Sequence, residues 1–277
     1  MTRPAIDDRI PWVRASGKRN GSLGRVFDHV GIAVSDLAAS ERFYRTVLSV
    51  LGLEPSHADA ELVEWEDWDI GATDREHPVT RGLHVGFRAR DREQVDAFWQ
   101  AGVDAGYSDD GAPGPRTQYS PTYYGAFLLD PDGNSVEAVH GDREQSVPAG
   151  RVDHLWIRVR DPQASRRFYA TIAPHAGLRL THDEPDRVQL SGPDYSFSLV
   201  RDERPLTEHV HLAFHRARGR HGARVPRRRA RGGLRGPWRA GRARGLPPGL
   251  LRRLRHQPGR AQRRGRQPQP LSPSPRR

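Results

Sequence analysis

Two histidines begin two similar segments of this 277-residue chain. His29 begins HVGIAVSDLAASERFY, and His84 begins HVGFRARDREQVDAFW 55 residues later. An imidazole can bind a metal ion or exchange protons near neutral pH, although a single histidine at the start of a strand is also compatible with a surface or core position. The chain has no cysteine. A disulfide scaffold, a thiolate zinc site and a cysteine nucleophile are therefore excluded.

The elements that would position these histidines follow from the apolar pattern. Alternating apolar residues after His29 predict a strand, and Asp36 stands where a helix N-cap is expected. Helical spacing follows up to Gly52, which is placed to end the helix. Short strands are expected at 61–65, 126–129 and 135–139, the last two joined by the turn DPDGN. The predicted order is βαβββ, twice, in an α+β fold.

A longer repeat indicates a duplicated domain. Residues 27–53 (FDHVGIAVSDLAASERFYRTVLSVLGL) return 125 residues later as 152–178 (VDHLWIRVRDPQASRRFYATIAPHAGL). His154 is thereby equivalent to His29, and His211 in HVHLAF is equivalent to His84. We expect a complete domain at 26–140, the first half of a second domain at 151–214, and a flexible extension at 1–25.

These motifs resemble the vicinal oxygen chelate superfamily, which includes glyoxalase I, bleomycin-resistance proteins, fosfomycin-resistance enzymes and extradiol dioxygenases. The resemblance implies paired βαβββ half-units that form a curved mixed sheet around a metal and substrate cavity. Carried onto this sequence, it implies the metal ligands His29, His84 and Glu137, and a degenerate second site at His154 and His211. Two imidazoles and one carboxylate suit one divalent ion, with Fe, Mn, Zn, Ni and Co all left open.

The resemblance implies a metal-dependent lyase, isomerase or dioxygenase that acts on a small oxygen-bearing substrate. A second interpretation is a protein that sequesters a small molecule or antibiotic without chemistry, as bleomycin-resistance proteins do. Tyr123 and Tyr124 precede the strand leading to Glu137, so one hydroxyl is a candidate acid or hydrogen-bond donor, with cross-strand packing as the alternative. Arg116 on the Gly/Pro-rich stretch DDGAPGPRTQYS, read as a loop at the rim of the cavity, is a candidate for binding an anionic substrate.

The basic charge is confined to the end of the chain. Residues 216–277 contain 21 arginines and no acidic residue, whereas residues 1–215 contain 24 basic and 34 acidic residues. Nucleic-acid binding therefore rests on this tail alone and is the least favoured function. No segment has the length and hydropathy of a membrane span or a secretory signal, so a cytoplasmic protein is expected.

The tail also has the composition of an out-of-frame translation. Read one base forward, codons for 238–248 permit GAPGERGAYH, and codons for 248–269 permit PGYYAAYVINPDGHNVEAVNH, which match residues 111–140 in order and spacing. Residues 215–277 are therefore expected to be disordered and to replace the missing half of the second domain. Lacking that half, residues 151–214 are expected to expose strand edges, and a homo-oligomer is one outcome.

Overall fold

The computed structural model describes residues 27–141, 148–192 and 195–214. The expected extension at 1–25 and the tail at 215–277 lie outside these residues. The order of elements is βαβββ, βαβββ, βαβββ and one further strand, as the repeats predict. The helices and strands are β1 (Phe27–Val34), α1 (Leu37–Val50), β2 (His57–Ala58), β3 (Leu62–Glu64), β4 (Trp68–Ala72), β5 (His84–Arg88), α2 (Arg92–Asp104), β6 (Asp109–Pro115), β7 (Tyr124–Leu129), β8 (Ser135–His140), β9 (Val152–Arg158), α3 (Pro162–Ala176), β10 (Arg179–Glu184), β11 (Arg187–Ser191), β12 (Ser196–Val200) and β13 (Val210–Phe214).

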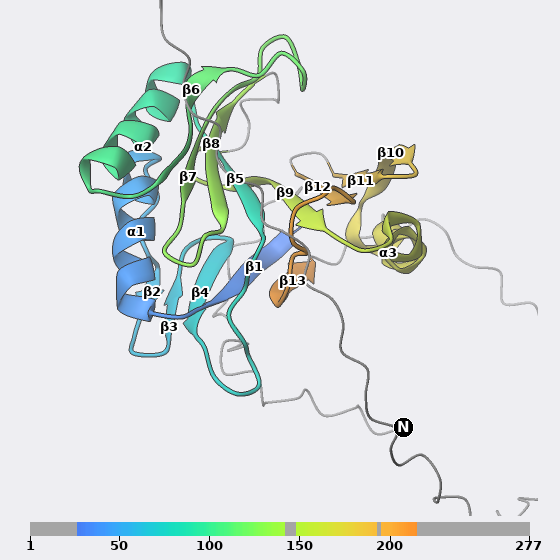
Figure 1. Ribbon diagram of the computed structural model, residues 1–277, viewed down its shortest axis with the longest axis horizontal. Coiled ribbons are helices and arrows are strands. Elements are labelled where there is room, and N and C mark those ends of the chain that lie inside the picture. The colour runs from blue at the N-terminus through green and yellow to red at the C-terminus, as the bar shows by residue number, and fades with distance from the viewer. Residues whose placement is uncertain (1–26, 142–147, 193–194, 215–277) are drawn as a thin grey trace, which may run out of the picture. The chain divides into compact units, whose positions relative to one another are not determined.

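The strands form two mixed sheets, and the α+β class is confirmed (Figure 1). One sheet has the order β13-β1-β4-β3-β2, and the other has the order β10-β11-β12-β9-β5-β8-β7-β6. Strands of the first two units thus pair with strands after residue 150: β5 runs antiparallel to β9, and β1 runs antiparallel to β13. β1 contains His29 and β5 begins with His84, and these two strands are in different sheets.

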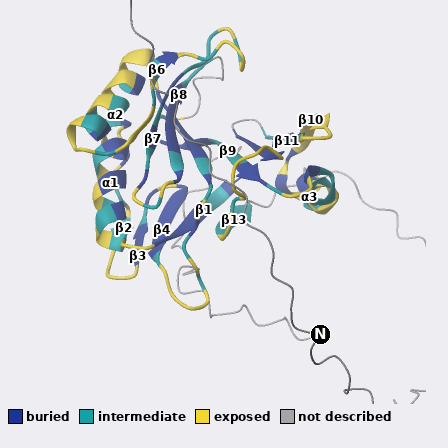
Figure 2. Ribbon diagram, viewed as in Figure 1, coloured by how far each residue is buried: buried dark blue, intermediate teal, exposed yellow. Residues whose placement is uncertain are grey.

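The helices cover the sheets through the apolar faces that their sequences predict. Asp36 is the N-cap of α1, where its carboxylate accepts a hydrogen bond from the Ala39 backbone amide at 2.9 Å. Gly52 follows the helix with φ of 77°, in the left-handed region that favours glycine. Figure 2 shows α1 and α2 exposed on their outer sides, while Phe43 and Phe98 are fully buried on their inner sides. No helix among the described residues is long and apolar enough to cross a bilayer.

Helix α3 differs from its equivalent α1 in how much it buries. Phe43 on α1 is fully buried and packs edge-to-face against Tyr107, which follows α2. Phe168, its counterpart on α3, is 64% exposed. Helices α1 and α2 pack against each other, whereas the main contacts of α3 among the described residues are with β10, β11 and β12. The apolar face that α1 buries against a second helix is therefore open on α3.

The two faces of the eight-stranded sheet have different chemistry because side chains alternate along each strand. Val85 and Phe87 of β5 point into the core, as do Leu155 of β9 and Val136 of β8. The residues between them point to the opposite face, which lines a cavity. The stretch DDGAPGPRTQYS reaches this cavity as expected, but its first half is wrong as a loop prediction, because residues 109–115 form the edge strand β6.

Candidate metal centre

The register of three strands brings a carboxylate and two imidazoles together. Glu137 on β8 and His154 on β9 are both paired with Gly86 on β5, which lies between them. His84 is two residues before Gly86 on β5 and therefore points to the same face. A Cβ atom at Gly86 would overlap the His154 ring, and one at Gly125 would overlap the Glu137 carboxylate. These two glycines leave the space in which the three side chains converge.

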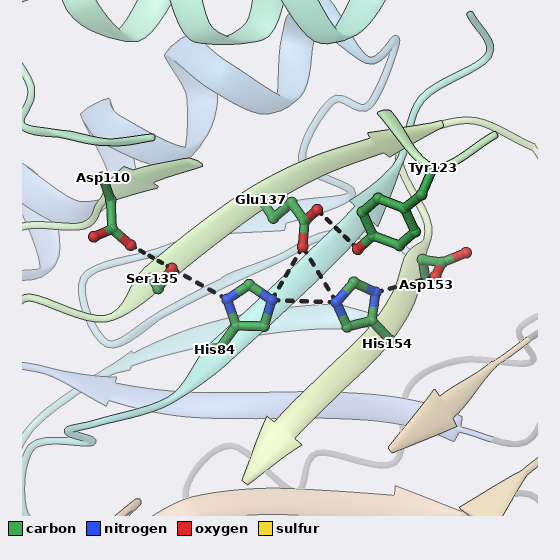
Figure 3. Close-up of polar contacts among 7 residues, drawn as sticks. All are labelled: His84, Asp110, Tyr123, Ser135, Glu137, Asp153 and His154. Carbon is green, nitrogen blue, oxygen red and sulfur yellow. Dashed lines mark hydrogen bonds and ion pairs between the residues drawn. The ribbon is translucent and has the colours of Figure 1, made fainter. Parts of the chain in front are cut away.

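The three ligand atoms lie at nearly equal distances from one another (Figure 3). His84 Nε2 is 3.1 Å from Glu137 Oε2 and 3.1 Å from His154 Nε2. His154 Nε2 is 3.2 Å from the same Glu137 oxygen. Two nitrogens and one oxygen thus form a small triangle on the cavity wall, the only such group of potential metal ligands among the described residues.

This donor set fits a divalent ion. Two atoms bound about 2.1 Å from an ion lie about 3.0 Å apart at a right angle and about 3.4 Å apart at a tetrahedral angle. The observed separations of 3.1 and 3.2 Å fall in this interval. Two histidines and a carboxylate on one face would leave the opposite positions of an ion open toward the cavity.

The other ring nitrogen of each histidine is held by a hydrogen-bonding partner. His84 Nδ1 lies 3.1 Å from Ser135 Oγ, whose hydroxyl in turn donates to Asp110 at 2.7 Å. The serine hydroxyl therefore accepts from His84, so Nδ1 carries the proton and the Nε2 lone pair is left for a ligand bond.

His154 is held in the same way by a carboxylate. Its Nδ1 lies 3.1 Å from Asp153 Oδ1, and the second oxygen of Asp153 accepts a hydrogen bond from Arg88 at 2.9 Å. Arg88 is only 7% exposed, so this chain of contacts is buried within the sheet. Both imidazoles consequently present Nε2 toward Glu137.

Glu137 is oriented by a tyrosine. Tyr123 donates a hydrogen bond of 2.8 Å to Glu137 Oε1, which leaves Oε2 facing the two histidines. Burial and the charge of Glu137 raise the pKa of Tyr123, so this phenol keeps its proton. Although burial disfavours its charge, the neighbouring His154 and His84 imidazoles hold the pKa of Glu137 below its ordinary value. The carboxylate is therefore ionised and oriented.

The two histidines differ in basicity because their Nδ1 partners differ. Burial lowers the pKa of His84, whose Nδ1 faces a neutral hydroxyl. Burial acts on His154 too, but hydrogen bonds to Asp153 and Glu137 raise its pKa to about 9. Two carboxylates thus make His154 the more electron-rich imidazole of the pair.

The structure brings His84 together with His154, not with His29 as the family resemblance implies. His29 lies in the other sheet, where it stacks on His211 at 5.1 Å between ring centroids and its Nδ1 is 3.0 Å from Asp28. His154, assigned to the degenerate second site, lies with His84 and Glu137 instead. The cause is the strand pairing, since β5 joins β9 and β1 joins β13.

Of the remaining predicted site residues, Tyr123 and Arg116 line the cavity and Tyr124 does not. Of the two tyrosines, Tyr123 lies at the cluster, whereas the Tyr124 hydroxyl donates to Asp96 of α2 at 2.8 Å. Arg116 lines the cavity, with its guanidinium 5.2 Å above the Phe127 ring and a hydrogen bond of 2.8 Å to the Ala112 carbonyl. The cavity has a volume of about 1200 Å³, enough for a small organic molecule.

Sequence reasoning missed the residues that hold the ligands. Ser135 and Asp110 behind His84 carry no motif of their own. Asp153 belongs to an Asp-His pair that the two copies of the repeat share. This repeated pair was the signal that could have identified Asp153 as the partner of His154, because Asp28 contacts His29 in the same way.

One family model and several solved structures are similar to parts of this chain. The family model described as "Glyoxalase/Bleomycin resistance protein/Dioxygenase superfamily" matches residues 26–138. A glyoxalase/bleomycin resistance protein from Albidiferax ferrireducens T118 is 35% identical over 41% of this chain and 98% of its own, with a TM-score of 0.38. No curated protein sequence matches the chain. The chain belongs to the glyoxalase/bleomycin resistance protein/dioxygenase superfamily.

More distant solved structures are similar over a longer part of the chain. Glyoxalase I from Zea mays is 18% identical over 69% of this chain and 72% of its own, with a TM-score of 0.47. A putative dioxygenase from Bacillus subtilis subsp. subtilis str. 168 is 13% identical over 69% of this chain and 71% of its own, with a TM-score of 0.45.

Proposed function

We propose that the chain is a divalent-metal-dependent enzyme whose ligands are His84, Glu137 and His154. The observation that carries the proposal is the triangle of ligand atoms, each 3.1 or 3.2 Å from the other two, with both Nδ1 atoms held from behind. His29, which the sequence analysis placed in this set, is outside it in the proposal.

A bound divalent ion would supply Lewis acidity toward two oxygens of a small substrate. The chain's own residues define the rest of the site. With an ion in place of the proton on the His154 Nε2 atom, both histidines would offer neutral nitrogens and Glu137 a single negative charge. The site with its ion would then carry a net positive charge that attracts an oxyanion. Tyr123 holds Oε1 of the carboxylate and keeps its proton at the edge of the cavity. We retain Arg116 as a candidate contact for an anionic substrate at the rim.

The test of the proposal is elemental analysis of the purified full chain, followed by an activity screen with the metal it contains. We expect about one first-row divalent ion per chain, and turnover of a lyase, isomerase or dioxygenase substrate only with that ion present. A chain that binds small molecules equally well with and without metal would instead support the sequestering function of the alternative interpretation.

We also propose that residues 26–140 and 151–214 are a complete and a partial copy of one domain. The order of elements β9-α3-β10-β11-β12 repeats β1-α1-β2-β3-β4, and the exposed Phe168 supports the proposal that the second copy lacks a helix equivalent to α2. The open face of α3 makes self-association an expected property of the chain, which light scattering over a range of concentrations would test.

A further inference from the structure

Some of the arginines that line the cavity have no carboxylate partner among the described residues. Its lining includes four acidic residues and the arginines Arg88, Arg90, Arg116, Arg158, Arg187 and Arg204. Arg88 pairs with Asp153 at 2.9 Å, and Arg158 pairs with Asp202 at 3.1 Å. Arg90 contacts its neighbour Asp91. Three of the six arginines are thus paired with carboxylates.

Arg187 is the unpaired arginine with the most restricted surroundings. It begins β11, and its guanidinium lies 4.7 Å above the ring of Trp156. Its Nε is buried and has no hydrogen-bond partner, and the side chain forms no ion pair with any described residue. Burial lowers the pKa of this guanidinium, because the side chain is partly withdrawn from water.

The position of Trp156 places this cation on the same wall as the candidate metal centre. Trp156 is paired with His84 across β5 and β9, and it lies two residues after His154 on the same face. Ser198 is paired with Trp156, and Gln189 is paired with Ser198; both line the cavity. A hydroxyl and an amide therefore accompany the guanidinium in the direction away from the three ligands.

An uncompensated guanidinium inside a cavity is costly unless an anion binds there. The contact with Trp156 holds the guanidinium over the indole ring, and the N–H groups that do not face the ring remain available to a ligand. A carboxylate matches this arrangement, since its two oxygens can accept paired hydrogen bonds from one guanidinium.

We propose that Arg187, supported by Trp156, is an anion subsite, and that the substrate carries a carboxylate in addition to the two oxygens that face His84, Glu137 and His154. The substrate part of this inference rests on the proposed function, whereas the anion subsite does not require a metal. Two experiments separate them.

The first experiment titrates the metal-free full chain with benzoate in a calorimeter, with benzyl alcohol as the neutral comparison. We expect benzoate to bind at least fivefold more weakly to Arg187→Met than to the original chain, because the methionine keeps the contact with Trp156 and removes the charge. Arg187→Lys keeps a charge but not the fork and should be intermediate. Arg204→Met, which removes an exposed arginine of the same cavity, is the matched control and should bind benzoate as the original chain does.

The second experiment uses the Co²⁺-loaded chain and two kinds of chelator. Acetohydroxamate presents two oxygens alone, and the monohydroxamates of succinic, adipic and suberic acid add a carboxylate at increasing distance. We expect at least one of these three to bind about tenfold more tightly than acetohydroxamate, and Arg187→Met to abolish that advantage while leaving acetohydroxamate binding unchanged.

The outcomes distinguish the two proposals. Equal benzoate affinity in the original chain, Arg187→Met and Arg187→Lys, with unchanged circular dichroism, would overturn the anion subsite. Equal affinity for all hydroxamates on a chain that holds Co²⁺ would overturn the inference about the substrate. Failure to retain Co²⁺ would overturn the proposed function, and the benzoate titration would still decide the role of Arg187.

Discussion

Replacing His154 with alanine tests the candidate metal centre most directly, because His29 is a matched control at the equivalent position of the repeat. His154 Nε2 lies 3.1 Å from His84 Nε2 and 3.2 Å from Glu137 Oε2, whereas His29 stacks on His211 in the other sheet. We expect His154→Ala to lose most of its metal and His29→Ala to keep it.

The size of the effect follows from the ligand count. Structural zinc sites with four ligands bind with about 10–16 kcal/mol, or roughly 3 kcal/mol per ligand. Loss of one ligand should therefore weaken binding by about 100-fold, since each 1.4 kcal/mol is a factor of about ten. Competition with a fluorescent chelator would measure this change, and elemental analysis would report the stoichiometry.

A second substitution tests whether the loss of metal in His154→Ala results from unfolding. His154→Gln keeps an amide that can donate to Glu137, so the cluster should stay intact while metal binding still weakens. Melting temperatures should separate a folded, metal-poor chain from an unfolded one. Loss of metal in His29→Ala together with full retention in His154→Ala would refute the assignment and restore the ligand set of the sequence analysis.

Four further outcomes are expected. Asp153→Asn should weaken metal binding by about 10- to 100-fold in the same competition assay, because the amide holds the His154 imidazole less well; an unchanged affinity would show that this carboxylate is dispensable. Gly86→Ala should lower metal content by displacing the His154 ring, while Gly141→Ala, whose Cβ would have no neighbour closer than 3.8 Å, should not; equal content in both variants would contradict the packing argument. Tyr44→Phe should cost about 1–2 kcal/mol in urea denaturation, because a buried hydroxyl that donates to Asp130 at 3.0 Å is removed; an unshifted midpoint would contradict this. Sequencing the gene should show an open frame, one base forward of the codons for residues 215–277, that encodes a GAPG loop, a Tyr-Tyr pair and a VEAV strand; stop codons before that strand would remove the frameshift interpretation.

The local parts of the fold were predictable because they depend on neighbouring residues. Alternating apolar residues marked β1, and Asp36 and Gly52 marked the ends of α1. The stretch 109–115 was misread because its glycines and prolines indicate a loop, whereas β6 is an edge strand with an irregular register to β7. Edge strands tolerate proline where central strands do not.

The candidate site was only partly predictable because its ligands depend on which strands pair. The family resemblance singled out His84 and Glu137, which lie next to each other in the structure. Repeat matching identifies only equivalent positions along the chain. It gives no information on whether β5 pairs with β1 or with β9, since either pairing buries the same apolar residues. The proposed anion subsite at Arg187 had no signal in the sequence, because a single arginine at the start of a strand matches no motif.

The pairing of β5 with β9 has a consequence for the order of events during synthesis. His84 leaves the ribosome 70 positions before His154, and Glu137 also precedes His154. Until β9 has emerged, the nascent polypeptide holds only two of the three side chains, and the edge of β5 that will meet β9 has no partner. A fragment that ends at residue 140 would likewise contain the whole first domain but only two of the three proposed ligands. A stop codon between residues 141 and 154 would therefore remove the third proposed ligand without altering any residue of the segment that matches the family.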